Sequence, residues 1–332
     1  MKSVEYEIVR ERGAGILDFP SRGLLEVSGG EAMRFLNGLV TNDVAKLENN
    51  AWMQAAFPNA QGRLLALVRV LRIGDDKFLF DVDAVNYEKI LQNLFRFTFA
   101  GDFKVADLSN NYSLISIQGK KAAEIISQIP DSNFQIPNSK NQIAVFEFQN
   151  HEIKLINTTH TAENGFDLFV PNNLIQDLTS ALETLGAIKI SEDTREVLRV
   201  EAGIPKYGVD VDESTIVLET GMDEAVSFNK GCYIGQEIIA RIHFRGHVAK
   251  RLSGLILEEN VESQPNDELK SLAGKAAGRI TSASFSPALD KRIALALIRY
   301  DFLEPGTELF VVRAGSQLTK AKVATLPFVQ NS

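Results

Sequence analysis

Cysteine occurs once in the 332 residues of the sequence, so the chain cannot form an intramolecular disulfide. Proteins without disulfides are typical of reducing compartments, and we therefore expect a cytoplasmic location. A single thiol also cannot supply the four ligands of a conventional iron–sulfur centre or of a structural zinc site. The sequence alone therefore predicts no resident metal.

Long apolar runs are also missing, because no segment approaches the roughly 20 apolar residues that span a membrane. The first 13 residues carry charges throughout, and we expect neither a signal peptide nor contact with a membrane. No glycine-rich phosphate loop follows any of the predicted strands, which argues against a nucleotide site of the P-loop or dinucleotide kind.

An excess of positive charge is absent as well. The sequence has 43 acidic and 35 basic residues, a net charge of −8, whereas a surface that coats nucleic acid needs a concentrated basic excess. We therefore rank direct RNA binding lowest among the expected interactions, while leaving room for one local basic patch. The composition is otherwise that of a soluble globular protein, and the length predicts two or three domains.

Strand-like runs are repeatedly followed by apolar residues at helical spacing. Such pairs fall at 24–39, 78–95, 114–129 and 167–185, which predicts an α+β fold of repeated units rather than a doubly wound sheet. From residue 252 onward, alternating strands are broken by glycine and proline turns. This pattern predicts a small C-terminal β-barrel.

The single cysteine lies in the segment Lys230-Gly231-Cys232-Tyr233-Ile234-Gly235-Gln236-Glu237. A run of good helix formers follows Gly235, so we expect Cys232 at or near the start of a helix. Free backbone N–H groups there would stabilise a thiolate, as would the charge of Lys230. Cys232 and Lys230 are therefore candidate catalytic residues. The alternative is that Cys232 is a small buried hydrophobe.

Basic and titratable residues alternate after this segment. Arg241, His243, Arg245 and His247 recur at every second position, which predicts a strand with one cationic face, and Lys250 follows. We take Arg241, His243, Arg245 and Lys250 as candidates for binding a partner. The alternative is a solvated strand face without a partner.

Three phrases of the sequence resemble one group of proteins. Residues 230–237 resemble the K-G-C-Y-x-G-Q-E motif of the YgfZ family, folate-binding relatives of the glycine-cleavage T-protein (aminomethyltransferase). Residues 199–210 resemble the R-x-E-A-G-x-P-x-Y-G-x-D phrase of the T-protein superfamily, and residues 30–44 resemble its opening G-x-D-A…F-L…T-N-D-V. The similarity extends over nearly the whole chain.

This resemblance implies an α+β, T-protein-like (GcvT-like) clover-leaf of three domains, with a folate-binding channel near the centre. The expected domains are a folate-binding T-protein-like domain at 1–48 plus about 146–250, a second α+β domain at about 49–145, and a C-terminal β-barrel domain at 251–332.

The resemblance also implies tetrahydrofolate, or another folate derivative, as cofactor. Asp167 stands where the superfamily has an acid that faces the pteridine, and it is one methylene shorter than the usual glutamate. Arg195 and Arg199 are candidates for the carboxylates of the folate tail, and Tyr207 and Glu201 complete the expected cofactor-binding set. Plain alternatives stay open, namely a solvated acid, ion pairs along a helix surface, and core packing for the tyrosine.

One departure from the aminomethyltransferases bears on activity. In those enzymes an aspartate after a Gly-Gly turn acts beside the folate nitrogen that accepts the one-carbon unit. The corresponding residues 62–67 contain no acid here. Without a carboxylate to handle the proton, we predict that glycine-cleavage activity is absent.

Proteins of the YgfZ family are linked to maintaining certain iron–sulfur enzymes, including some that modify tRNA. The resemblance therefore implies a folate-binding accessory protein that supports assembly or repair of iron–sulfur proteins through Cys232. The expected partners are iron–sulfur enzymes or cluster carriers, with which a transient cluster would be shared. The alternatives are a folate-dependent one-carbon transferase or demethylase, and a protein-docking scaffold without catalysis.

Overall fold

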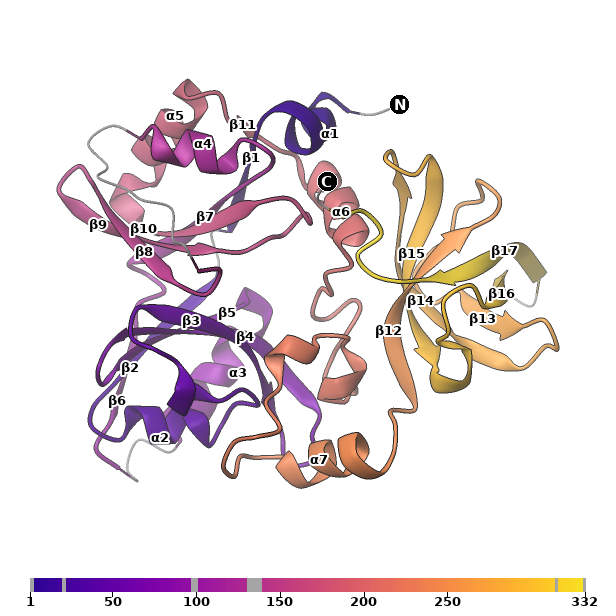
Figure 1. The fold of residues 1–332 in the computed structure, drawn as a ribbon, viewed down its shortest axis with the longest axis horizontal. Helices are drawn as coiled ribbons and strands as arrows, with labels where there is room; N and C mark the ends of the chain where they lie inside the picture. The colour runs from indigo at the N-terminus through magenta and orange to yellow at the C-terminus, as the bar shows by residue number, and fades with distance from the viewer. Residues whose placement is uncertain (1–2, 20–21, 97–100, 130–138, 314–315, 331–332) are drawn as a thin grey trace.

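The computed structural model describes residues 3–19, 22–96, 101–129, 139–313 and 316–330. Figure 1 shows three bodies: two sheets that carry helices on their outer faces, and a β-barrel beside them. Helix α6 (Glu192–Ala202) lies between the first sheet and the barrel. Within the described ranges, no helix is long and apolar enough to cross a membrane.

The first sheet has the strand order β11-β1-β7-β10-β9-β8. Helices α4 (Ala122–Ser127) and α5 (Ile175–Thr184) cover its outer face, because their buried residues share one core with Leu168 of β10. Its strands are β1 (Gly15–Phe19), β7 (Tyr112–Gln118), β8 (Ile143–Phe148), β9 (His151–Asn157), β10 (Gly165–Pro171) and β11 (Ile188–Lys189).

The second sheet has the order β3-β4-β5-β2-β6. Helices α2 (Ala32–Asn37) and α3 (Ala84–Phe95) cover its outer face and share a core with Val68 and Val70 of β4. Its strands are β2 (Gly23–Ser28), β3 (Ala51–Pro58), β4 (Leu64–Gly74), β5 (Lys77–Val82) and β6 (Lys104–Asp107).

The inner faces of the two sheets pack against each other. Leu71 of β4 and Phe169 of β10 belong to one apolar cluster that draws residues from both sheets. Side chains alternate along a strand, so Arg69 and Asp167, each two residues earlier, face the same inner layer. Charges placed in such a layer require partners.

The barrel closes in the order β12-β15-β14-β13-β16-β17. After the last strand the chain returns to α6, where the amide of Phe328 donates to the Glu201 carbonyl at 2.8 Å. The barrel strands are β12 (Lys250–Leu257), β13 (Glu268–Ser271), β14 (Ala276–Ser286), β15 (Lys291–Arg299), β16 (Glu308–Arg313) and β17 (Ser316–Ala324).

The remaining elements connect these bodies. Helix α1 (Val4–Glu7) continues as a π-helical turn at Ile8–Arg12, and helix α7 (Gln236–Arg245) precedes the barrel. Short 3₁₀ turns lie at Val44–Lys46, Asn172–Leu174, Val217–Glu219, Asp223–Ala225 and Tyr300–Phe302.

The predicted α+β fold with repeated units and a C-terminal barrel is confirmed. The helix expected from Ser191 begins at Glu192, and the Ser191 hydroxyl accepts from the Thr194 amide. It ends at Gly203, whose φ of +70° allows the left-handed cap that glycine favours.

Two strands, β2 and β7, belong to a different sheet from the one that the expected domain ranges imply. Strand β2 pairs with β5 in the second sheet, although it lies within 1–48. Strand β7 pairs with β10 in the first sheet, although it lies within 49–145. The chain therefore crosses between the two sheets more often than the expected ranges imply.

The strand predicted around Arg241 to His247 is wrong, because Gln236–Arg245 forms helix α7. At 100° per residue, Arg241 and Arg245 share one helix face while His243 points elsewhere. Ile239 on α7 is fully buried, so an apolar residue and not the basic alternation fixes the structure of this segment.

Candidate functional site

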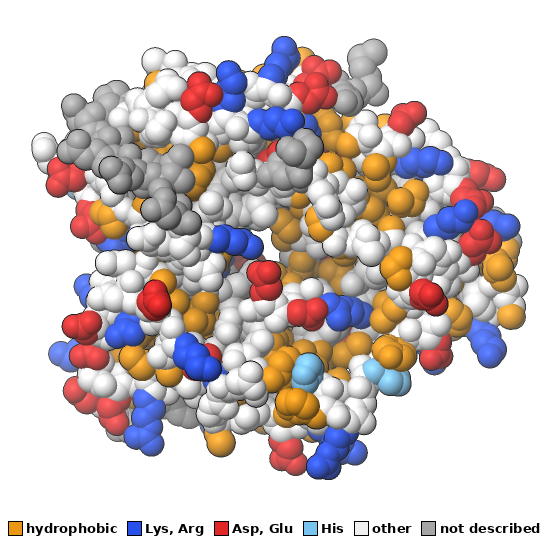
Figure 2. Space-filling view, in the orientation of Figure 1, with side chains coloured by type: hydrophobic (Ala, Val, Ile, Leu, Met, Phe, Trp, Pro, Cys, Tyr) orange, Lys and Arg blue, Asp and Glu red, His pale blue; other side chains and the backbone are white. Residues whose placement is uncertain are grey.

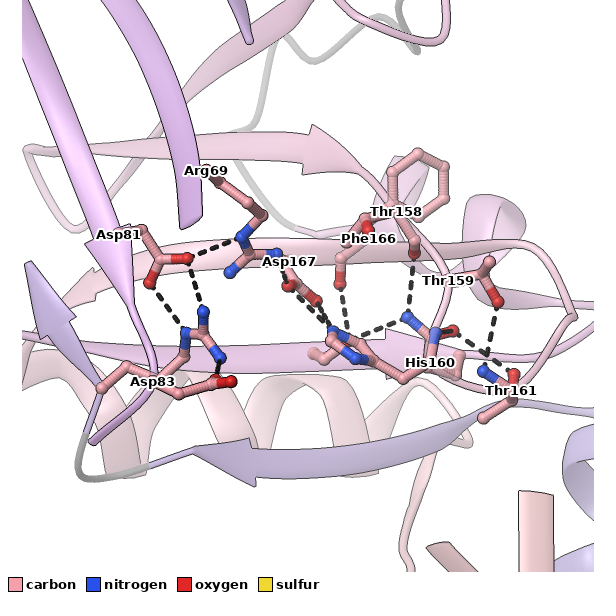
Figure 3. A network of polar contacts seen from close by, with 12 residues as sticks. Arg69, Asp81, Asp83, Thr158, Thr159, His160, Thr161, Phe166 and Asp167 are labelled. Carbon is pink, nitrogen blue, oxygen red and sulfur yellow. Dashed lines mark hydrogen bonds and ion pairs between the residues drawn. The ribbon is translucent and has the colours of Figure 1, made fainter. Parts of the chain in front are cut away.

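A chain of buried charges crosses the layer between the two sheets. Arg69 of β4 donates through Nε to Asp81 of β5 at 2.6 Å and through Nη1 to Asp167 of β10. Arg22 donates to both oxygens of Asp81 at 2.8 Å and also contacts Asp83. Figure 3 shows Arg69 between the carboxylates of Asp81 and Asp167.

His160 completes this chain on the side of the first sheet. Its Nε2 lies 3.0 Å from each oxygen of Asp167. Burial by itself would raise the pKa of Asp167, but the charges of His160 and Arg69 outweigh it and hold that pKa well below its ordinary value. Asp167 is therefore an ionised, fully buried carboxylate.

An aromatic ring links His160 to helix α6. The Phe19 ring lies 4.8 Å from the imidazole of His160, and the guanidinium carbon of Arg195 lies 4.4 Å from the centre of the Phe19 ring. The structure therefore links two of the predicted residues, Asp167 and Arg195, through His160 and Phe19.

Gln118 of β7 fixes the loop that carries His160. Its side-chain amide nitrogen donates to the Thr158 carbonyl at 3.1 Å, and its oxygen accepts from the His160 amide at 2.9 Å. Thr159 and Ala162 of the same loop line a cavity of about 370 Å³. The end of α6 and the C-terminal segment form the rest of its wall, through Ala202, Ile204, Pro327 and Gln330.

Arg199 and Glu201 lie in separate ion-pair networks of α6. Arg199 donates to Asp210 at 2.7 Å and to the Ser282 hydroxyl of β14 at 2.8 Å. Glu201 is fully buried and accepts from Tyr6, Arg10 and Ser286. Both side chains hold α6 to its neighbours.

Tyr207 stands apart from the charge chain. Its hydroxyl donates to the Leu64 carbonyl at 3.4 Å, and its ring packs beside an apolar cluster that includes Leu64, Val217 and Tyr233.

The segment around Cys232 is a loop and not the first turn of a helix. Helix α7 begins at Gln236, and Gly235 precedes it with φ +81°. Cys232 is exposed. The backbone N–H groups at the helix start are thus separated from the thiol by the intervening loop residues.

Lys230 holds this loop in place. Its ammonium donates to the carbonyls of Asn37 and Val40 at 2.8 Å and of Asn42 at 2.6 Å. Burial lowers the pKa of Lys230 to about 8, and the nearby Asp43 carboxylate opposes that shift. Lys230 therefore positions the loop through these three hydrogen bonds, and its predicted role beside the thiol stays a prediction.

Helix α7 presents aromatic and basic side chains together. The His243 ring stacks on Phe228 at 3.6 Å, and Phe244 beside it is 67% exposed. Arg241 and Arg245 lie on the same helix, and Lys250 begins β12. At the lower edge of Figure 2, histidine, hydrophobic and basic side chains lie next to one another.

Sequence reasoning missed Arg69, Asp81 and His160. A charged residue at an inner position of an apolar strand is the available signal, and both Leu-Val-Arg-Val-Leu in β4 and Leu-Phe-Asp-Val in β5 carry it. His160 has no comparable signal, because it lies in an irregular loop.

Two family models together match almost the whole chain. The family described as GCVT N-terminal domain matches residues 2–230, and the glycine cleavage T-protein C-terminal barrel domain matches residues 250–330. An aminomethyltransferase of Thermus thermophilus is 30% identical over 98% of this chain and 90% of its own length. One from Thermoanaerobacter is 29% identical over 93% of this chain and 84% of its own length.

A solved structure shares the fold. The glycine cleavage system aminomethyltransferase T from Bartonella henselae superposes with a TM-score of 0.87 at 23% identity, over 98% of this chain and 89% of that protein. The two matching domains span both sheets and the barrel. The chain therefore belongs to the GcvT family, with a GCVT N-terminal domain followed by a T-protein C-terminal barrel.

Proposed function

We propose that this protein is a folate-binding member of the YgfZ type that supports assembly or repair of iron–sulfur proteins, including enzymes that modify tRNA. The observation that carries the proposal is the exposed Cys232 on a loop that Lys230 fixes. A thiol meant only for packing would be buried. An accessible thiol in a fixed loop can instead meet a partner.

The residues around the cavity suit a folate. A volume of about 370 Å³ lies in the range of small-molecule sites. Thr159 and Gln330 offer polar groups in its wall. Arg195, partly exposed over the Phe19 ring on α6, is the cation that we propose for a carboxylate tail. A bound reduced folate would supply a carrier of one-carbon units.

The proposed partners are iron–sulfur enzymes or cluster carriers that dock on α7. Arg241, Arg245 and Lys250 would meet acidic residues of the partner, and His243 with Phe244 would provide an apolar anchor. Cys232 would then supply one thiolate to a transient cluster whose other ligands come from the partner.

Residues 62–67 support the absence of glycine-cleavage activity. Ala66 is fully buried in the core of the second sheet, and Leu67 packs against the cluster around Tyr233. Neither side chain can take up a proton.

The experiment combines folate binding with function in cells. Calorimetry with a reduced folate is compared for wild type, Cys232→Ala and Arg195→Ala, and the same variants are tested for restoring iron–sulfur enzyme activity in cells that lack the protein. We expect Cys232→Ala to bind folate normally but to fail in restoration. Full restoration by Cys232→Ala would reject the proposed role of the thiol.

A second candidate is a folate-dependent one-carbon transferase. It is favoured by relatives that are named aminomethyltransferases and match 98% of the chain, and by the His160–Asp167 pair, which could move a proton. An assay of methylene transfer to tetrahydrofolate separates the two candidates. Turnover by the purified protein would favour the transferase.

A further inference from the structure

We infer that the C-terminal barrel shares in partner docking. His247, Arg299 and Tyr300 continue the surface of α7, and the partner presents to it a short acidic segment that carries an apolar side chain. This docking rests on the proposed function, to which it adds residues of the barrel and the chemistry of the partner. None of the three residues lines the cavity of the candidate site.

Two aromatic stacks lie where α7 leads into the barrel. In the first, the His243 ring stacks on Phe228 at 3.6 Å and meets Phe244 edge-on at 4.7 Å. In the second, the His247 ring stacks on Tyr300, after β15, at 3.7 Å. Phe244 is 67% exposed and Tyr300 47%. Exposed aromatic side chains that gather in this way mark an interaction surface, because they leave apolar area in water.

The two stacks connect three parts of the protein. Phe228 belongs to the loop that carries the exposed Cys232, so the first stack joins that loop to α7. The amide of Tyr300 donates to the Ala249 carbonyl at 3.0 Å, so the second stack joins the segment after α7 to the barrel. Figure 2 shows histidine and hydrophobic side chains together in this region. A partner that covers both stacks therefore contacts the barrel as well as the loop of the thiol.

Four cations that form no ion pair accompany the stacks. They are Arg241 and Arg245 on α7, Lys250 at the start of β12 and Arg299 at the end of β15. This statement covers the described ranges of the chain, in which the neighbouring Arg251 does pair, with Asp223 at 2.6 Å. In a protein with more acidic than basic residues, such a group of unpaired cations leaves room for carboxylates of a partner.

Two of these cations lie opposite each other. Lys250 of β12 and Arg299 of β15 are direct partners in the antiparallel ladder. Side chains at such positions share one face of the sheet, with Cβ atoms about 5 Å apart, and like charges there repel each other. The buried Glu219 carboxylate attracts Lys250 without forming an ion pair with it. A partner carboxylate between the two cations would relieve the repulsion.

The surrounding charges favour a short acidic segment over a nucleic acid strand. The net charge of the protein is −8. The exposed Glu237 begins α7, and the exposed Asp301 follows Tyr300. A long phosphate backbone would extend past the four cations into these acidic surroundings. A short segment ends within the group of cations, where the arginines can each hold a carboxylate through two parallel hydrogen bonds.

The test is calorimetry of the full-length protein with a short synthetic peptide of glutamates around one phenylalanine. We expect Arg299→Glu and Tyr300→Ala each to weaken binding by about tenfold, the loss that one anchor of an interface gives. Lys291→Glu, exposed at the other end of β15, is the matched control and should bind like wild type. Equal binding by wild type, Arg299→Glu and Tyr300→Ala would overturn the inference.

Exchange of charge gives a readout that a merely structural role would not produce. In a second peptide, lysines replace the glutamates. Arg299→Glu should bind this peptide more tightly than wild type does, whereas Lys291→Glu should not. A single-stranded RNA of uridines is the competing probe. Tighter binding of this RNA than of the acidic peptide by wild type would overturn the inference in favour of a nucleic acid.

Restoration of iron–sulfur enzymes in cells separates this inference from the proposed function. The variant Arg299→Glu/Tyr300→Ala should unfold at the temperature of wild type but fail to restore the enzymes, while Lys291→Glu should restore them. Full restoration by the double variant would overturn the inference and leave the proposed role of Cys232 intact. Failure of wild type to restore the enzymes would overturn the proposed function, whereas selective binding of the acidic peptide would still support the docking surface.

Discussion

Arg69 and Asp167 form an ion pair that joins the two sheets of the protein. Arg69 comes from β4 and Asp167 from β10, and both side chains are buried between packed strands. The contact therefore fixes the position of the second sheet relative to the first. It also neutralises part of the negative charge of Asp167.

Replacing Arg69 by methionine should lower the free energy of unfolding by about 3–5 kcal/mol, because it leaves the carboxylates of Asp81 and Asp167 buried without their shared cation. Urea unfolding measures the change. Arg34→Met is the control, since Arg34 is 89% exposed and 3.9 Å from Glu31, and it should change stability by less than about 0.5 kcal/mol. Equal effects of the two variants would contradict this account.

The stability of wild type should fall steeply in acid. A carboxyl whose pKa is lower in the folded than in the unfolded chain stabilises the fold above its unfolded pKa of about 4, and this contribution is lost as pH falls toward the folded pKa. Asp167 is such a group. Asp167→Asn should therefore show a shallower loss of stability from about pH 4 to pH 2, measured by thermal unfolding across a pH series. Parallel curves for the two proteins would show that Asp167 does not titrate in this way.

Lys230→Met should loosen the loop that carries Cys232, since three carbonyls lose a common donor. We expect a loss of about 1–3 kcal/mol in stability. We also expect faster hydrogen exchange at the Ile234 amide, which donates to the Gly38 carbonyl at 3.1 Å. Lys270→Met, at a half-exposed position of barrel strand β13, is the control. Unchanged exchange at Ile234 would show that Lys230 does not anchor the loop.

Arg199 and Arg195 should separate structural from ligand effects. Arg199→Lys should lower stability by about 1–3 kcal/mol, because lysine cannot reproduce the fork of contacts to Asp210, Glu196 and Ser282, while folate affinity stays within about twofold. Arg195→Ala should weaken folate binding and leave stability nearly unchanged, since Arg195 is partly exposed over Phe19. Calorimetry measures the folate affinity of both variants, and urea unfolding measures their stability. A loss of affinity confined to Arg199→Lys would refute this assignment.

Two glycines of one loop provide a matched pair. Gly235 has φ +81°, and an added Cβ would lie 2.4 Å from the Asn59 carbonyl oxygen, whereas a Cβ at Gly231 would meet nothing within 4 Å. Gly235→Ala should therefore lower stability by about 1–3 kcal/mol, and Gly231→Ala should change it little. Thermal unfolding of both variants tests the difference.

Local patterns predicted the helices and strands whose apolar periodicity is clear. The helix after Ser191 and the strands of the barrel are examples, because capping and alternation are encoded by neighbouring residues. The helix expected after Gly235 begins at Gln236, but its second half from Arg241 was mistaken for a strand, because the spacing of the basic residues was weighed above the continuing helical pattern.

The charge chain could not be predicted because its partners are distant in sequence. Arg69 and Asp167 are 98 positions apart, and only the packing of two sheets brings them together. The phrase around Asp167 pointed to a carboxylate that the structure buries and pairs with Arg69 and His160. Its enclosure by His160 depends on a loop whose conformation no short pattern specifies.

The first strand of the protein has a consequence for how the chain is made. Strand β1 pairs in parallel with β11 through Gly15 and Ile188, and the amide of Phe328 binds the Glu201 carbonyl. At about 5–20 residues per second, a ribosome needs on the order of 10–30 s between synthesis of β1 and β11. During that time the edge of β1 that faces β11 is unpaired. A nascent chain should therefore be unable to complete the first sheet before residue 188 is made, or to form the contact between α6 and Phe328 before the barrel is made.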